Sequence, residues 1–111
     1  MRKFYKEFAL KKVLECGGAE SWKKVKVGKE VYLINDLDEK VFKDFSKQVG
    51  VSIDKDGKKI IGVIPEEEGT LIKDFLDMGW DKLFCAIISQ NDDSKTLENR
   101  FKVAIYIAKG L

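Results

Sequence analysis

Residues 83–108 read LFCAIISQNDDSKTLENRFKVAIYIA, and this stretch decides the expected fold. Residues 83–89 are almost entirely apolar, and residues 100–108 place an apolar side chain at every second position. A two-residue period is typical of a β-strand that buries one face. The polar residues around Asn91-Asp92-Asp93 suit a loop between two strands. We therefore predict a β-hairpin that joins residues 83–89 to residues 100–108.

Two segments upstream carry the same signal. Residues 51–53 and 58–64 are rich in β-branched side chains, and they flank the turn sequence Asp54-Lys55-Asp56-Gly57. An Asp-Gly pair favours a hairpin turn, because glycine adopts the backbone conformation that the turn needs. Residues 22–27 and 30–34 flank a second glycine-containing turn in the same way. We predict a hairpin for each of these segments.

The first predicted helix covers residues 3–16. This segment contains good helix formers and stops at Gly17-Gly18, where glycine suits a helix end. Its apolar periodicity is poor, because Phe4 and Phe8 lie off the main apolar stripe. Aromatic side chains outside the stripe favour contact with other parts of the protein or with a partner.

Two further helices are predicted between the hairpins. One starts after a cap at Asp36 or Asp38 and ends before Gly50. The other follows Pro65, begins with three glutamates that complement the helix dipole, and ends at Gly79. Apolar side chains recur at helical spacing in both segments. They are Val41, Phe42, Phe45 and Val49 in the first, and Leu71, Ile72, Phe75, Leu76 and Met78 in the second.

These elements predict a single α+β domain over residues 1–111, because 111 residues fit one domain. Its three helices are expected to pack on an antiparallel-rich sheet in the order α-ββ-α-ββ-α-ββ. Two units also look alike: Gly28-Lys29-x-Val31 matches Gly57-Lys58-x-Ile60, and Lys43-Asp44-Phe45 matches Lys73-Asp74-Phe75. These matches raise the possibility of an internal ββα duplication.

The chain contains no histidine. Histidine is the commonest general base and metal ligand at neutral pH, so Ser-His-Asp and Cys-His catalysis are excluded. Cys16 and Cys85 form no CxxC zinc motif, and we interpret both as small buried apolar residues of a cytoplasmic protein. Asp54-x-Asp56-Gly57 begins like a calcium loop, but Pro65 stands where that loop needs a glutamate. We expect no enzyme activity, cofactor or metal site.

Charge is spread unevenly along the chain. Residues 1–30 carry nine basic and four acidic side chains, residues 31–80 carry seven and eleven, and residues 81–111 carry five and four. The total is +2, which is too close to neutral to identify a protein that binds polyanions. The longest apolar runs, 83–88 and 103–108, are far shorter than the roughly 20 residues of a membrane helix. We therefore expect no membrane partner.

Missing catalytic groups and segregated charge favour a protein that acts by occupying the surface of another. Opposite charges on two proteins steer their encounter, and tryptophan is a favoured interface anchor. We predict a small stoichiometric protein-binding module, such as an inhibitor, an immunity or anti-defence protein, or an adaptor. Lysine or tyrosine catalysis remains chemically possible, but no spacing singles out one residue. The expected partner-binding residues are Trp22, Trp80, Phe4, Phe8, Lys23, Lys24 and Lys26.

The alternative hypothesis is a single-stranded nucleic-acid-binding protein. Basic side chains attract phosphates, and aromatic side chains stack on bases. Only two of the 21 basic residues are arginine, which argues against this interpretation. Homo-oligomerisation through a strand edge is compatible with either function. The expected nucleic-acid-binding residues are Trp22, Lys23, Lys24, Lys26, Arg100, Lys102 and Tyr106.

Overall fold

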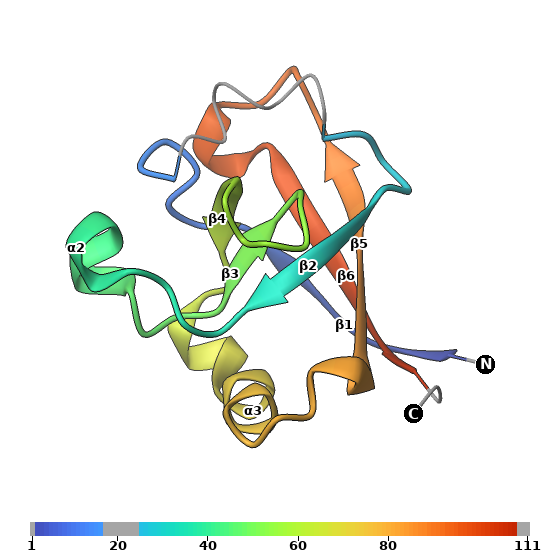
Figure 1. The fold of residues 1–111 in the computed structure, drawn as a ribbon. Helices are drawn as coiled ribbons and strands as arrows, with labels where there is room; N and C mark the ends of the chain where they lie inside the picture. Colours follow the sequence, from blue (N-terminus) through green and yellow to red (C-terminus); the bar gives the residue numbers. More distant parts are fainter. Residues whose placement is uncertain (1, 17–24, 109–111) are drawn as a thin grey trace.

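A computed structural model describes residues 2–16 and 25–108 (Figure 1). Its six strands form one antiparallel sheet in the order β1-β6-β5-β2-β3-β4. The strands are β1 (Arg2–Ala9), β2 (Glu30–Ile34), β3 (Gly50–Ser52), β4 (Ile60–Val63), β5 (Phe84–Asn91) and β6 (Phe101–Ala108). The helices are α2 (Glu39–Phe42) and α3 (Glu66–Asp77), with 3-10 turns at Lys43–Phe45, Asp81–Leu83 and Leu97–Asn99.

This architecture corrects the predicted fold class. Three helices on a sheet were expected, but among the described residues only α3, with 12 residues, is longer than one turn. Residues 3–16 contain the strand β1 and no helix. The first predicted hairpin is also wrong, because residues 25–27 form no strand and β2 pairs with β5 and β3. The described residues therefore form a six-stranded antiparallel sheet with one full helix, one single-turn helix and three 3-10 turns.

The segment of β1 forms a strand because it pairs with β6 over its whole length. The two run antiparallel from Arg2 opposite Ala108 to Ala9 opposite Lys102, with a bulge between Phe4 and Lys6. Phe8 is 1% exposed and lies in the main core. Backbone pairing and burial of this kind outweigh the small differences in helix propensity between residues.

The two units that resemble each other in sequence do not share a strand pairing. β3 and β4 are neighbours and form the predicted hairpin, whereas residues 25–27, the described part of the matching first strand, form no strand, and β2 pairs with β3 and β5. Gly28 and Gly57 do share a positive φ, of 92° and 71°. The described residues therefore do not contain the ββα unit twice, and the matching glycines reflect similar turn chemistry.

The sheet is curved, so that the ends of its two outer strands, β1 and β4, come into contact. Lys11, just beyond β1, exchanges two backbone hydrogen bonds of 2.9 Å with Val63 of β4. The approach is close enough that a Cβ on Gly62 would lie 3.1 Å from the Lys11 carbonyl oxygen and from Leu10 Cβ. Glycine at this position thus permits the contact that joins the two edges.

α2 is shorter than the sequence predicts. Asp38 caps it as expected, accepting a hydrogen bond of 2.9 Å from the Lys40 backbone N–H. The helix then stops at Lys43, which has a positive φ of 44°. Past the 3-10 turn, the Val49 carbonyl accepts a hydrogen bond from Ile64 instead of continuing a helix. Val49 therefore packs in the core under the sheet, and the segment that carries it leaves the helical path.

α3 is a helix as predicted, and it covers one end of the core (Figure 1). Its buried positions are Gly69, Ile72 and Leu76. A Cβ on Gly69 would lie 2.9 Å from Ile64 Cγ2, so the helix packs tightly on the segment that precedes it. The main core consists of Phe8, Leu10, Val13, Val25, Val31, Val49, Val51, Ile61, Ile64, Ile72, Leu76, Ala86, Ile88, Phe101, Val103 and Ile105.

Candidate functional site

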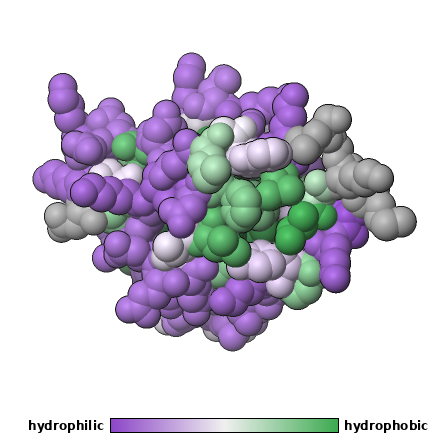
Figure 2. Space-filling view, turned by 90° about the horizontal axis from the view of Figure 1, so that it is seen from below, coloured by the Kyte–Doolittle hydropathy of each residue, from purple (hydrophilic) through white to green (hydrophobic). Residues whose placement is uncertain are grey.

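An apolar surface lies where the C-terminal end of α3, the turn Asp81–Leu83 and the ends of β5 and β6 meet. Figure 2 shows this side of the molecule, on which apolar side chains gather in the middle of a hydrophilic surround. The fold brings these side chains together from these four elements and the link between α3 and the turn. We call the set the apolar surface; it consists of Phe75, Met78, Trp80, Leu83, Phe84 and Ile107.

Backbone contacts fix the position of these side chains. The Trp80 N–H donates to the Phe75 carbonyl at 3.0 Å, directly after Gly79 turns the chain with a φ of 88°. The Phe75 and Phe84 rings meet edge-on with centroids 6.0 Å apart. Phe84 lies opposite Ile107 in the ladder between β5 and β6. The end of α3 is thereby joined to the end of the sheet.

The apolar surface is open to solvent. Met78 is 71% exposed, Trp80 44% and Ile107 39%, while the other three side chains are half-buried. Single exposed apolar side chains, such as Val41 on α2, are ordinary features of protein surfaces. A contiguous group of them marks an interaction site. This arrangement therefore suits binding of another macromolecule.

Charged side chains of both signs border the apolar surface. Asp74 and Asp77 lie near the C-terminal end of α3, and Asp81 and Lys82 follow in the next turn. Lys73 forms a salt bridge of 2.9 Å with Asp77, and these contacts hold the pKa of the Asp77 carboxyl below its usual range. On the other side, Lys3 of β1 lies opposite Ile107 in the ladder with β6.

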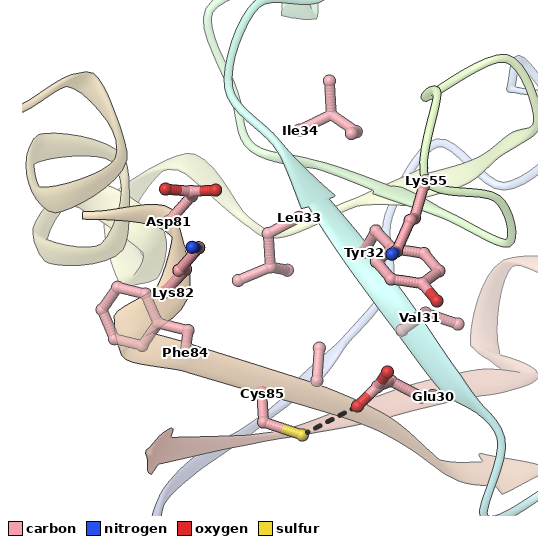
Figure 3. A pocket seen from close by; sticks show the side chains of 11 residues that line it. Glu30, Val31, Tyr32, Leu33, Ile34, Lys55, Asp81, Lys82, Phe84 and Cys85 are labelled. Carbon is pink, nitrogen blue, oxygen red and sulfur yellow. Dashed lines mark hydrogen bonds between the residues drawn. The ribbon is translucent and has the colours of Figure 1, made fainter. Parts of the chain in front are cut away.

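A cleft of about 440 Å³ opens next to the apolar surface, between β2 and β5 (Figure 3). It forms because the ladder between these strands contains only two pairs, Glu30 with Ile87 and Val31 with Ala86. Beyond them the strands diverge, and Leu33 points into the gap toward Phe84 (Figure 3). The remaining lining residues are Tyr32, Ile34, Lys55, Asp81, Lys82 and Cys85.

Neither described cysteine has the properties of a catalytic thiol. Cys85 lies at the cleft, donates to Glu30 Oε2 at 3.4 Å and accepts a hydrogen bond of 3.3 Å from the Arg2 guanidinium. Burial and the Glu30 carboxylate raise the pKa of the Cys85 thiol. Burial, together with nearby Glu15 and Glu98, raises the pKa of Cys16 to about 12. A thiol that stays protonated is a poor nucleophile.

The predicted partner-binding residues do not all lie together. Trp80 belongs to the apolar surface, whereas Phe4, 54% exposed, lies with Tyr106 on the outer face of the sheet. Phe8 is buried in the core, so its side chain is not available to a partner. Lys26 is exposed in the segment before β2. Trp22, Lys23 and Lys24 lie outside the described residues.

Three of the predicted nucleic-acid-binding residues, Arg100, Lys102 and Tyr106, lie on β6 or directly before it. Lys102 and Tyr106 share the outer face of this strand, because side chains alternate between faces. The Arg2 guanidinium lies over the Tyr106 ring at 4.8 Å from its centroid, and Phe4 meets the ring edge-on at 5.7 Å. Arg100 lies just before the strand and donates from Nε to Asn91 Oδ1 at 2.6 Å.

Sequence reasoning missed most of the apolar surface. Met78 carried a signal, because an apolar residue next to the glycine that ends a helix is free to face solvent. Ile107 carried none, since its position in the alternation of β6 is the same as that of buried Ile105. Its exposure results from its place at the open end of the sheet.

Residues 2–16 and 25–108 contain no group of three acidic or cysteine side chains placed to hold a metal ion. None of the helices in these ranges combines the length and apolar character needed to cross a membrane. The most developed surface features of the described chain are therefore the apolar surface and the adjoining cleft. No protein-family model matches the sequence, and neither a curated protein nor a solved structure is significantly similar to it.

Proposed function

We propose that the protein is a stoichiometric protein-binding module, of the inhibitor, immunity or anti-defence, or adaptor type, and that its binding face is the apolar surface. The observation that carries this proposal is the exposure of Met78, Trp80 and Ile107 on elements that the Phe75–Phe84 ring contact and the Phe84–Ile107 pair bring together at one end of the sheet. Burying such a group in an interface removes apolar area from water, which favours binding, and the loss of motional freedom on association offsets part of that gain. The module works by covering a partner's surface and needs no catalytic group.

The apolar surface defines the chemistry of the partner. Its border carries both signs of charge, with Asp74, Asp77 and Asp81 near the end of α3 and Lys3 opposite Ile107. Complementary charges accelerate encounter and suppress binding to wrong partners. The expected partner therefore presents an apolar anchor within a rim of charged side chains.

The test is affinity capture from a nuclease-treated native lysate of the source cells, followed by titration of the captured protein. We expect 1:1 binding by the wild type and at least about 30-fold weaker binding by Met78→Asp or Trp80→Ala, the effect of removing a hot-spot side chain. Met78 is 71% exposed, so Met78→Asp leaves the fold intact; Trp80 is 44% exposed, and circular dichroism checks that Trp80→Ala folds. The matched control is Val41→Asp, which changes a side chain that is 66% exposed on α2.

Two outcomes would count against the proposal. One is a stoichiometric partner that binds Met78→Asp and Val41→Asp equally well, because binding then uses another face. The other is multiple turnover of a substrate by the purified protein, abolished by one lysine or carboxylate substitution.

Single-strand nucleic-acid binding is a second candidate, favoured by the cluster of Arg2, Phe4 and Tyr106 with Lys102 on the same outer face of the sheet. It predicts oligonucleotide binding that weakens steeply with salt, since each neutralised phosphate releases counterions. Tyr106→Ala and Lys102→Ala are expected to weaken it, while Met78→Asp leaves it unchanged. A flat fluorescence titration at low salt would remove this candidate.

A further inference from the structure

The cleft between β2 and β5 is bounded by two strand edges that do not pair with each other. The Tyr32–Ile34 part of β2 pairs only with β3, on the side away from the cleft. At the start of β5, Phe84 and Cys85 pair only with β6, again on the far side. Figure 3 shows the resulting wedge between the two ribbons.

These edges carry backbone groups that can bind another peptide. In an antiparallel ladder, alternate residues direct both their N–H and their C=O toward the same neighbouring strand. At least one residue of Tyr32–Ile34, and one of Phe84 and Cys85, therefore faces the cleft. In the part of the chain that the structure describes, no turn or loop hydrogen bond involves the backbone of these five residues. An extended peptide supplies the matching donors and acceptors.

The size and lining of the cleft fit a short strand. Three residues of β2 rise about 10 Å, which matches about three residues of an added strand. A volume of about 440 Å³ accommodates the side chains that such a strand directs inward. Leu33 and Phe84 supply apolar contacts, while Asp81 and Lys55 supply charge at the rim.

We infer that this cleft binds an extended segment of the protein partner as an added β-strand, an inference that rests on the proposed protein-binding function. Phe84 lines the cleft and also belongs to the apolar surface, so one partner can cover both. The occupant is a peptide backbone, because unpaired strand edges recognise amides in extended conformation. The side chain it places between Leu33 and Phe84 is apolar.

The experiment uses a phage-displayed library of linear random 12-residue peptides, selected on the full-length protein. We expect enriched peptides to share an apolar residue within a β-prone stretch. A synthetic peptide of the selected sequence is then N-methylated at one residue at a time. Methylation of every second amide is expected to weaken binding about five- to tenfold, because those amides bond to the strand edge, and methylation of the others is expected to have little effect.

Two protein variants complete the test. Leu33→Trp fills the cleft and is expected to weaken peptide binding at least tenfold, whereas Met78→Asp leaves it unchanged. Circular dichroism shows whether Leu33→Trp folds; if it does not, the N-methyl series decides alone. Amide exchange within Tyr32–Ile34 is expected to slow when the peptide binds.

Three results would overturn the inference: no enriched peptide, equal effects of N-methylation at neighbouring residues, or wild-type peptide affinity in folded Leu33→Trp. Self-association through the cleft in place of peptide binding would also overturn it. A different result would contradict the proposed function: Met78→Asp would bind the captured partner as tightly as the wild type does.

Discussion

The two halves of the sheet differ in how completely their strands pair. β1, β5 and β6 have eight residues each and form two ladders of seven pairs, each with one bulge, whereas β2, β3 and β4 have five, three and four residues. We call the first set the long-strand half and the second the short-strand half. The long-strand half is the rigid framework of the sheet. The cleft lies at its boundary with the short-strand half, between β5 and β2. The surface features that we propose for binding thus lie where strand pairing ends, as is common for loops and edges held by a rigid framework.

The largest expected effect comes from the core of the long-strand half. Phe101 is fully buried, and Phe101→Ala is expected to lower the free energy of unfolding by about 3–5 kcal/mol through lost burial and cavity formation. Ile34→Ala, at the half-buried rim of the cleft, is expected to cost only about 1 kcal/mol. Urea denaturation of both variants measures the difference. Equal losses would show that the two halves are equally well packed.

Two glycines allow a finer comparison. Gly28 and Gly57 both have a positive φ, which costs a residue with a Cβ roughly 1–2 kcal/mol. A Cβ at Gly28 meets nothing within 4 Å, whereas one at Gly57 lies 3.1 Å from Ile34 Cδ1. Gly57→Ala is therefore expected to lower the unfolding temperature more than Gly28→Ala. If the two substitutions lower the unfolding temperature equally, the Ile34 side chain can move aside, and this wall of the cleft is not rigidly packed.

The smallest expected effect is on pH dependence. Asp54 accepts hydrogen bonds from the Ser52 hydroxyl and from the backbone N–H groups of Lys58 and Lys59, and these bonds lower its pKa. Because the pKa of Asp54 is lower in the folded than in the unfolded state, its ionised form stabilises the fold at pH values above the unfolded-state pKa of about 3.9. This contribution to the free energy of unfolding is lost as the pH falls through the folded-state pKa. Unfolding free energy is thus expected to drop below about pH 4.

The control for this prediction is Asp54→Asn. Asparagine keeps a side-chain oxygen that accepts hydrogen bonds but has no carboxyl group that titrates. Its stability is expected to be lower at pH 7 and to fall less between pH 5 and pH 3 than that of the wild type. Because Asp77 and Asp92 also have lowered pKa values, part of the acid sensitivity should remain. An unchanged pH profile in Asp54→Asn would show that this carboxylate does not stabilise the turn between β3 and β4.

The sequence predicted those elements whose signals are local. The hairpins β3–β4 and β5–β6 follow from turn residues and alternation, and α3 follows from Pro65, its glutamates and Gly79. β1 was missed because its strand character depends on pairing with β6, about 100 residues away. α2 was overestimated because its apolar spacing continues to Val49, while that residue packs in the core of the sheet.

The candidate site was predictable only in part. Trp80 was identified because tryptophan is a common interface anchor, and it does lie on the apolar surface. Ile107 and Phe84 reach that surface through strand register, which no local pattern encodes. The cleft arises from the divergence of β2 and β5, a property of strand order. Its lining residues carry no common motif, so sequence reasoning had no signal for it.

Native-state amide hydrogen exchange of the free protein tests most directly whether the sheet is open where binding is proposed. Amides of Val103–Ile105, paired on both sides in the long-strand half, are expected to exchange only on global unfolding. At least one amide within Tyr32–Ile34 should exchange orders of magnitude faster, since it faces the cleft unpaired. If all amides of Tyr32–Ile34 exchanged as slowly as those of Val103–Ile105, β2 and β5 would be hydrogen-bonded along their length and no cleft would exist.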